Sequence, residues 1–317
     1  MTNSTRINIA RFTKPLSALA LCAGAATIML GRDLGLLFTT VKNESAYTHI
    51  AVIPFISLYF LWSRREHLKT AQGNRIWGTI LISTGFALFL FVRNTLSTDP
   101  FVPISLKASA VLIVTVGSFI LLFGPKAAYH SLFSLLILVF AIPMPASVLS
   151  HTITFLQNGS ALMVDWILSL TAQVYVRDGL NFHLENISIH IAPECSGIRS
   201  TMALIITMAM ASQIMLKTWW GKVAAMLMII PLSLLKNAIR ISTITLLAQH
   251  VDKSFLTDNF LHKGGGIIFY ALVLLLFLPI VLFLSRLEQK QSTSTGVKKS
   301  DTRRYSLQSD MEKVNRL

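Results

Sequence analysis

Long apolar runs recur along the whole chain, and they constrain its fold more than any other feature of the sequence. An α-helix needs about 20 predominantly apolar residues to cross the roughly 30 Å hydrocarbon core of a bilayer. Eight segments reach or approach that length: 15–31, 47–62, 76–92, 108–123, 129–142, 196–216, 222–247 and 264–284. Only 13% of the residues are charged, where a soluble domain carries about 25%. The sequence therefore predicts an all-α polytopic membrane protein with about eight transmembrane helices.

The chain has two cysteines, which lie in different settings. Cys22 is inside the first apolar run, whereas Cys195 stands at the start of the sixth, in the segment APECSGIRS. Two thiols placed in this way do not indicate a disulfide framework. Because no small-residue cleavage site follows the first run, we interpret that run as a retained span and not as a signal peptide.

Lysine and arginine cluster in short polar stretches between the apolar runs. Cytoplasmic loops carry an excess of these residues, so the N-terminus, residues 63–75, Lys126, residues 217–222 and the tail from Arg286 are placed inside. The intervening loops then lie outside: 32–46, 93–107, 143–194 and 248–261. Both termini are expected in the cytoplasm. The net charge of +14 belongs to these loops and indicates contact with membrane lipids, with no nucleic acid as a partner.

The outer loop 143–194 is the longest, and its first part is ambiguous. Residues 146–172 can form an outer-surface amphipathic helix, a re-entrant segment or a span. We expect the outer-surface helix, because a further span would break the alternation of basic loops. Pro143 and Pro145 predict a sharp change of direction before this segment.

The second part of the same loop alternates apolar and polar residues in LNFHLENISIHIAP, residues 180–193. A two-residue turn at Glu185-Asn186 predicts a β-hairpin with all its apolar residues on one face. Those residues are Leu180, Phe182, Leu184, Ile187, Ile189 and Ile191. Open strand edges are not tolerated in lipid, so the hairpin is expected at or above the outer surface, directly before Cys195.

Ionisable residues in or beside spans are the most informative residues of a membrane protein. Three groups of such residues and their polar neighbours lie at predicted outer ends: Glu194, Cys195 and Arg199; Lys236, Asn237 and Arg240; and His262. The predicted topology brings Cys195, Arg240 and His262 to the same membrane face. No residue of this set was used to derive the topology, so their agreement is a partial check on it.

A cysteine, a histidine and an arginine on one face can carry out acyl transfer. The thiolate is the nucleophile, histidine moves the proton, and arginine can hold the oxyanion of a tetrahedral intermediate. Ser196 and Gly197 follow Cys195 at a helix start, where free N–H groups favour a thiolate.

Simpler interpretations of the same residues stay open at this point. Cys195 can be inert packing, Lys236 and Arg240 can be interfacial residues that extend towards water, and Asn237 can join two helices. His262 can anchor a helix at the headgroups, and Arg199 can pair with Glu194.

The order of the three motifs adds a further observation. APECSGIRS, then NAIRIS, then HKGGG resembles the pattern of the exosortase/archaeosortase family, which has Cys-Ser-Gly with a nearby Arg, Asn-x-x-Arg, and a His shortly before a glycine. The segments AYTHIAVIPFISLYFLWSRRE and IPMPASVLS also look like parts of that family. The resemblance extends over roughly residues 45–285.

The resemblance implies a membrane cysteine protease or transpeptidase of the prokaryotic inner membrane, with its active site at the outer face. Such an enzyme cleaves a C-terminal sorting signal of secreted proteins: a Pro-Glu-Pro-like motif, a transmembrane helix and a basic tail. It then passes the protein to a lipid-linked or polysaccharide-linked surface acceptor. Residues 1–285 would form one multi-pass catalytic domain, and 286–317 a polar, basic, disordered cytoplasmic tail.

Residue by residue, the resemblance implies that Cys195 is the nucleophile, Arg240 stabilises the oxyanion or thiolate, and His262 is the base. It gives supporting roles to Glu194, Ser196, Gly197, Arg199 and Asn237. Lys263 departs from the apolar or aromatic residue that more often follows the histidine, which leaves the substrate subtype open. No cofactor or metal is expected.

Two other classes of protein are compatible with a polar set in a membrane chain. A transporter or flippase would line a path with Arg240, Lys236, Glu194 and Asp165, but such sites lie near the bilayer midplane between repeated halves. The polar set here gathers at one predicted face, and the sequence shows no internal repeat. A non-catalytic scaffold for surface assembly would tolerate replacement of Cys195.

Overall fold

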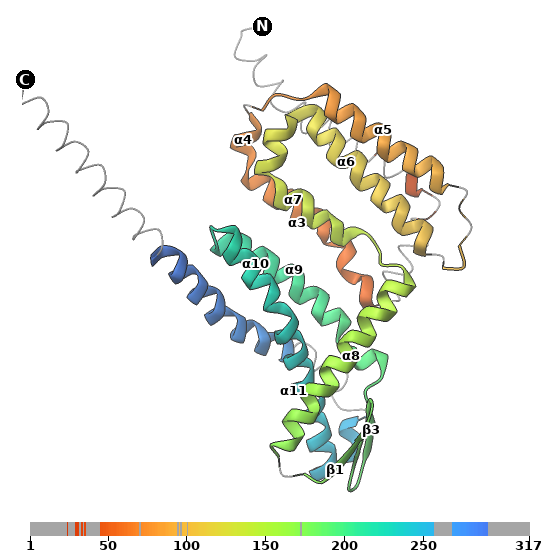
Figure 1. Cartoon of the computed structure of the whole chain (residues 1–317), viewed down its shortest axis with the longest axis vertical. Helices are drawn as coiled ribbons and strands as arrows, with labels where there is room; N and C mark the ends of the chain where they lie inside the picture. Colours follow the sequence, from red (N-terminus) through yellow and green to blue (C-terminus); the bar gives the residue numbers. More distant parts are fainter. Residues whose placement is uncertain are drawn as a thin grey trace, which may run out of the picture. The chain divides into compact units, whose positions relative to one another are not determined.

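The computed structural model describes residues 45–256, except 70, 94, 96, 100 and 172, together with 268–290 and residues 24, 29–31, 33 and 35. The chain divides into two compact units, Met1–Phe155 and Leu156–Leu317. The first unit contains helices, and the second combines helices with a three-stranded antiparallel sheet (Figure 1). The expected helical membrane fold with a small sheet before the Cys195 helix is confirmed, and the single catalytic domain stays a prediction.

Five helices of the described part of the chain are long and apolar enough to cross a membrane. They are Arg75–Val92, Phe101–His130, Pro193–Met215, Trp219–His250 and Ile268–Lys290, and each overlaps a predicted span. A sixth candidate is the bent pair Leu132–Ala141 and Ala146–Ser169. The helix over the predicted span 47–62, Tyr47–Ser63, is shorter than these. Most of the predicted span 15–31, including Cys22, lies outside the described residues.

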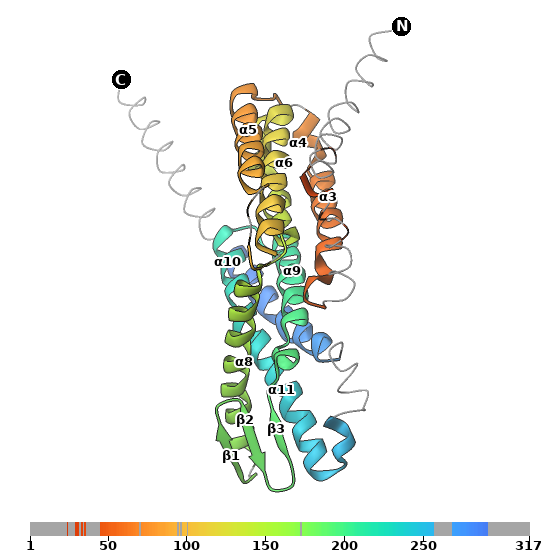
Figure 2. The same cartoon turned by 90° about the vertical axis from the view of Figure 1, so that its right-hand side faces the viewer.

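The first unit is built from helices in sequence order. They are η1 (Ser45–Ala51), α3 (Ile53–Ser63), α4 (Arg65–Lys69), α5 (Arg75–Val92), α6 (Phe101–His130), α7 (Leu132–Leu136) and η2 (Ile137–Ala141). Helices α5 and α6 lie side by side (Figures 1 and 2). Helix α6 is interrupted at Gly124, because Pro125 cannot donate to the preceding turn. The interruption falls beside Lys126, where the sequence predicts a cytoplasmic turn.

A sharp bend follows η2. The helix Leu132–Ala141 and helix α8 (Ala146–Ser169) meet at 97° across Pro143-Met144-Pro145, which confirms the predicted change of direction. Two side chains hold the bend: the Tyr47 hydroxyl donates to Met144 O at 2.8 Å, and the Ser105 hydroxyl donates to Pro143 O at 2.6 Å. Residues 146–169 are one continuous helix, and their placement on the membrane surface stays a prediction.

The sheet of the second unit has the strand order β1 (Tyr175–Asp178), β2 (Asn181–Leu184), β3 (Ser188–His190). Strands β2 and β3 form the predicted hairpin, since Phe182 lies opposite Ile189 and the turn is at Glu185-Asn186. Strand β1 was not predicted. The Gly179-Leu180 dipeptide joins it to β2, since Asp178 pairs with Asn181. Glycine at the first position of a two-residue loop is a recognised hairpin signal, and Gly179 has the positive φ of 59° that such a turn requires.

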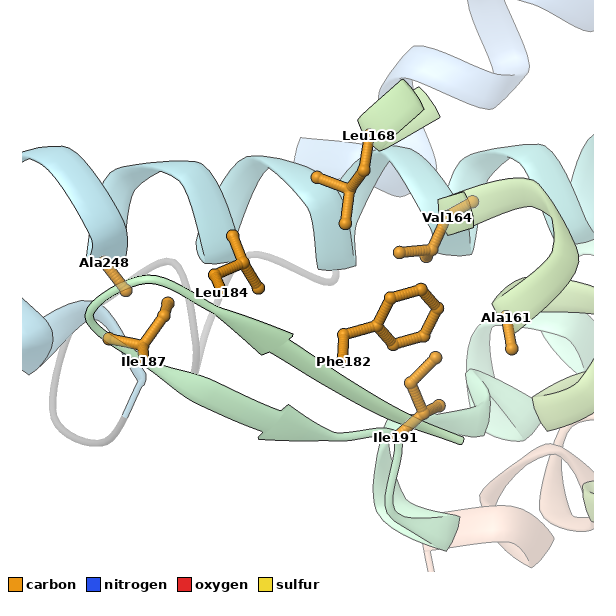
Figure 3. Close-up of a cluster of buried hydrophobic side chains, with 9 residues drawn as sticks. Ala161, Val164, Leu168, Phe182, Leu184, Ile187, Ile191 and Ala248 are labelled. Carbon is orange, nitrogen blue, oxygen red and sulfur yellow. The ribbon is translucent and has the colours of Figure 1, made fainter. Parts of the chain in front are cut away.

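One face of the sheet packs against helices, as Figure 3 shows. Phe182 is completely buried at the centre of a cluster formed by the sheet, α8 and α11 (Ile229–His250). Its members are Ala161, Val164, Leu168, Phe182, Leu184, Ile187, Ile191, Ala238 and Ala248. The polar residues between the apolar ones, such as His183 and His190, are exposed on the other face. The sequence alternation therefore decides which face of the sheet is buried.

Strand β1 is held to α8 by polar contacts as well. The Tyr175 hydroxyl donates to Asp165 Oδ1 at 2.7 Å, and Arg177 Nη1 lies 3.1 Å from Asp165 Oδ2. Burial and the neighbouring Asp165 carboxylate raise the pKa of Tyr175 to about 12, so its hydroxyl remains a donor through the neutral range. Asp165 thus has a structural role beside the sheet.

The remaining helices of the second unit are α9 (Ile198–Met215), α10 (Trp219–Leu227), α11, η4 (Lys253–Leu256) and the helix Ile268–Lys290. The Glu288 carboxylate near the end of the last helix accepts hydrogen bonds from Lys217 N at 2.9 Å and Thr218 N at 3.1 Å. The α9–α10 turn and the end of the last helix therefore lie at the same end of this unit. That helix continues to Lys290, five residues past the predicted domain end; residues 291–317 are outside the described part.

Candidate active site

Cys195 lies in a tight turn between the sheet and a long helix. Residues Pro193–Ser196 form the short 3-10 helix η3, in which Cys195 N donates to Ala192 O at 2.9 Å. Gly197 follows with φ 74° and begins α9, which confirms the predicted position of Cys195 at the start of a span. Cys195 is half-buried, whereas the neighbouring Ser196 is fully buried. The thiol is thus partly accessible on an otherwise fixed turn.

Asn237 on α11 fixes this turn in place. Its side-chain amide donates to Cys195 O at 2.8 Å and to the Ser160 hydroxyl of α8 at 3.0 Å. Asn237 is only 2% exposed, so both bonds form away from water, where an unpaired amide is costly. One side chain therefore connects the cysteine turn, α8 and α11. The family resemblance implied a supporting role for Asn237 but did not identify this partner.

Arg240 follows Asn237 by three residues on α11 and is half-buried. Residues three apart on a helix share a face, so Arg240 lies on the side of α11 that Asn237 turns towards Cys195. Asn237 is about 20 Å along the helix axis from the last residue of α11, at 1.5 Å per residue. The site therefore lies beside the middle of α11, at the base of the sheet. The sequence had placed it towards the outer end of this helix.

Lys236 corrects one interpretation made from the sequence. We interpreted it as an interfacial lysine extending towards water, but its side chain is only 2% exposed, and Nζ donates to the Ser200 hydroxyl on the first turn of α9. Ser200 in turn donates to Gly197 O at 3.0 Å. Lys236 and its neighbour Asn237 both lie on the buried side of α11, so the lysine side chain is directed to α9. The position of Lys236 inside an apolar run could have indicated a buried, functional lysine, because ionisable residues in such runs mostly face the protein interior.

Hydroxyl groups add to the contact between α9 and α11. The Thr201 hydroxyl lies 2.6 Å from the Ser233 hydroxyl and 2.9 Å from Gly197 O. On the other side of the turn, the buried Gln157 amide donates to Ile191 O at 2.8 Å. Sequence analysis missed Ser160, Ser200, Ser233 and Gln157, since short polar residues in apolar runs carry no distinct pattern. Together these contacts make the cysteine turn rigid.

The other supporting residues predicted from the sequence divide into exposed and buried ones. Glu194 and Arg199 are exposed on either side of Cys195, and no ion pair joins them among the described residues. The Ser196 hydroxyl and Asn237 Oδ1 are buried beside the cysteine and have no hydrogen-bond partner in the described part of the chain. The structural pairing of Arg199 with Glu194 that the sequence left open is therefore not observed.

The predicted base, His262, lies outside the described residues, so its role stays a prediction. Two other histidines of the loop before Cys195, His183 and His190, are on the exposed face of the sheet. His183 Nδ1 is 2.9 Å from Ser188 Oγ, and His190 Nδ1 is 2.7 Å from Asn181 Oδ1. Among the residues that the structure describes, no group of three His, Cys, Asp or Glu side chains could hold a metal ion.

Gly197 gives a prediction that depends on this geometry. A Cβ atom at Gly197 would lie 2.8 Å from Asn237 Oδ1, closer than real Cβ contacts allow, and the positive φ of 74° disfavours a side chain as well. Gly197→Ala is expected to displace Asn237 from Cys195 O and to lower processing of a substrate by at least about tenfold, since a misplaced reacting group loses much of its rate. The rate of thiol modification at Cys195 and the processing yield measure the effect.

Gly179→Ala is the matched control for this variant. Gly179 also has a positive φ, 59°, but no atom lies within 4 Å of the position that its Cβ would take. Both variants therefore share a backbone cost of roughly 1–2 kcal/mol, and only Gly197→Ala meets Asn237. Equal processing by the two variants would contradict the proposed contact between the glycine and the asparagine.

Comparison with known proteins identifies a family model that includes the residues of this site. The model of one protein family, described as transmembrane exosortase (Exosortase_EpsH), matches residues 41–279. The match contains the two motifs that meet in the structure, at Cys195 and at Asn237 to Arg240, and also includes the position of His262. No curated protein and no solved structure matches the chain significantly.

Proposed function

The chain belongs to the transmembrane exosortase family, and on this premise we propose that it is a cysteine transpeptidase that removes the C-terminal sorting signal of secreted proteins. Family membership implies a multi-pass membrane sorting enzyme whose substrates carry a sorting signal. The proposal adds three points: acyl transfer through a thioester, the residues that carry it out, and the form of the sorting signal. The sequence resemblance implies that this signal is a Pro-Glu-Pro-like motif, a transmembrane helix and a basic tail.

The observation that carries this proposal is the bond from the Asn237 amide to Cys195 O. It ties the turn that bears the thiol to the helix that bears Arg240, so a nucleophile and a permanent cation are held on facing elements. A fixed arrangement of this kind is what acyl transfer requires, because preorganised charge stabilises the oxyanion without reorganisation. A lone structural cysteine would need no such support.

The proposed reaction has two steps. His262 accepts the proton of the Cys195 thiol, the thiolate attacks the scissile carbonyl carbon, and Arg240 stabilises the oxyanion. The intermediate collapses to a thioester, the C–N bond breaks, and His262 as general acid delivers the proton to the leaving amine of the sorting signal. A nucleophilic group of a lipid-linked or polysaccharide-linked acceptor then attacks the thioester, His262 accepts its proton, and Cys195 leaves as the thiolate that takes up this proton. Ser196, Gly197 and Asn237 position the turn, and Glu194 and Arg199 border it.

Co-expression with candidate substrates from the same genome tests this function. The expected result is a substrate shortened by its C-terminal helix, with any added mass on the new terminus identifying the acceptor. Mass spectrometry of the purified substrate measures both quantities. Unprocessed substrate in the presence of well-expressed enzyme would contradict the proposal and favour a transporter or a scaffold.

The proposed topology places both termini in the cytoplasm and the site at the outer face. It is supported by Glu288, which joins the α9–α10 turn to the end of the last helix and so puts two predicted cytoplasmic segments at one end of the unit. The sheet, which has one polar face, packs against the half of α11 that is farther from that end, at Ala238 and Ala248, and it leads into Cys195 at the start of α9.

A membrane-impermeant thiol reagent is expected to label Cys195 when it is added from outside, because the thiol is half-buried and not enclosed. Cys22 should react much less, as a residue of a predicted span. Single-cysteine variants in intact cells and inverted vesicles separate the two sites. Labelling of Cys195 from the cytoplasmic side alone would reverse the proposed orientation.

A further inference from the structure

Strand β3 is an edge strand that leads directly to the candidate nucleophile. The strand order is β1-β2-β3, and no element of the described chain pairs with the outer side of β3. From its last residue, His190, the chain reaches Cys195 through residues 191–194. An unpaired strand edge exposes a row of backbone donors and acceptors that can pair with another chain.

The register identifies which backbone groups point away from the sheet. Leu184 N donates to Ile187 O at 2.8 Å, and Ile191 N donates to Leu180 O at 3.0 Å. In an antiparallel pair the bonded residues alternate along the strand, so residues 187, 189 and 191 face β2. The N–H and C=O groups of Ser188 and His190 therefore face outward. His190 O is already used by Ala192 N at 3.0 Å.

Three outward groups remain: the N–H and C=O of Ser188 and the N–H of His190. Neither residue's N–H has a hydrogen-bond partner among the described residues. The edge is also held firmly, since Ile191 O accepts from the buried Gln157 amide and Ile191 is 1% exposed. It is thus a rigid template of about three residues beside the cysteine turn.

We propose that the substrate segment on the N-terminal side of the scissile bond adds to this edge of β3 as a fourth strand. This inference rests on the proposed function, and it names how the same site holds its substrate. Strand addition provides affinity through main-chain hydrogen bonds. It also fits a substrate that is extended where it is cleaved, because a nucleophile must reach the backbone carbonyl.

The topology selects the occupant and its direction. β3 runs from the sheet towards Cys195 at the start of a span. A secreted protein anchored by a C-terminal helix runs in the same direction, from the outside into the membrane. The two segments therefore pair in parallel. In such a pair Ser188 offers both its N–H and its C=O to the same neighbouring strand.

The other edge of the sheet does not serve equally well. β1 is separated from β3 by β2, so a chain paired on the outer side of β1 would lie three strand spacings, about 14 Å, from the strand that leads to Cys195. The side chains of Tyr175 and Arg177 on β1 also contact Asp165 of α8. Only the β3 edge is continuous with the site.

Disulfide scanning tests the pairing without turnover. The enzyme carries Cys195→Ala, Cys22→Ser and Ser188→Cys, and the co-expressed substrate carries single cysteines at successive positions before its cleavage site. Successive side chains of a strand point to opposite faces, so cross-linking is expected at one position and more weakly two residues away, but not at its direct neighbours. An even profile, or no cross-link at any position, overturns the proposal.

A pair of variants provides the second test, in an enzyme that retains Cys195. Ser188→Pro removes the outward N–H, and proline is compatible with the solvent side of an edge strand. Ser188→Ala loses the same hydroxyl contact to His183 but keeps the N–H. Processing by the proline variant is expected to be at least about tenfold lower than by the alanine variant, with Cys195 labelled by thiol reagent at an equal rate in both.

Equal processing by the two variants overturns strand addition. If the proline variant also loses thiol labelling of Cys195, the substitution has disturbed the cysteine turn. The cross-linking profile then decides by itself whether the substrate pairs with β3. Failure of the wild-type enzyme to shorten any substrate is a different result, because it removes the proposed function. Normal shortening together with an even cross-linking profile removes only the pairing with β3.

Discussion

Cys195→Ala is expected to abolish removal of the sorting signal, with a loss of at least about a thousandfold, because removing the nucleophile of such an enzyme leaves only binding and oxyanion stabilisation. Cys195→Ser is expected to fail as well. A serine hydroxyl is a weak nucleophile unless a base deprotonates it, whereas a thiol is a few per cent ionised at neutral pH. The measurement is the mass of a co-expressed substrate in each variant.

The second cysteine of the chain provides the matched control. Cys22→Ser changes the same atom in a residue that has no predicted role, and it is expected to process substrate at the wild-type level. Neither Cys195 variant should lose expression or membrane insertion, because the turn is held through Cys195 O and not through the sulfur. Equal processing with and without the Cys195 thiol would remove the nucleophile and leave the transporter and scaffold interpretations.

Arg240→Lys is expected to lower processing by about a hundredfold to a thousandfold, as for the loss of one oxyanion donor. Lysine keeps the charge, but a point charge does not replace the planar fork of a guanidinium group. Lys236 cannot compensate, since its Nζ is committed to the Ser200 hydroxyl. The loss should be found in kcat rather than in KM, because the oxyanion exists only in the transition state and intermediates.

Arg286→Lys is the control for this exchange. Arg286 is exposed on the last helix, near the end that Glu288 joins to the α9–α10 turn, and the same chemical change there should leave processing unaltered. Thiol labelling of Cys195 should remain unchanged in Arg240→Lys, which separates a loss of catalysis from a loss of structure. Full activity of Arg240→Lys would show that Arg240 holds no oxyanion.

The sheet shows how far local pattern alone can predict this fold. The alternation of Phe182 and Ile189 with polar residues predicted both the β2–β3 register and its buried face, because side chains of a strand alternate between faces. Strand β1 was missed although Gly179-Leu180 marks its turn, since its Tyr-Val-Arg-Asp sequence has little apolar alternation of its own. It is held by pairing with β2 and by contacts of Tyr175 and Arg177 with Asp165, ten and twelve residues away in the sequence.

The candidate site was predicted in its chemistry but not in its contacts. The sequence and the family resemblance selected Cys195, Asn237 and Arg240 as a set. They did not indicate that Asn237 holds the backbone of Cys195, or that Ser160 and Gln157 of α8 support the same turn. The prediction for Lys236 was wrong, because in isolation a lysine in an apolar run is best placed in water.

By itself the sequence determined that this chain is a helical membrane protein, where the five long apolar helices of its described part fall, and that a hairpin precedes the cysteine. These properties depend on hydrophobic length and on local periodicity, which can be read along the chain. Only the tertiary structure decided which polar groups meet inside the helix bundle. Those partners are 32 to 77 residues apart in sequence, and in an apolar interior a donor bonds whichever acceptor the packing brings within reach.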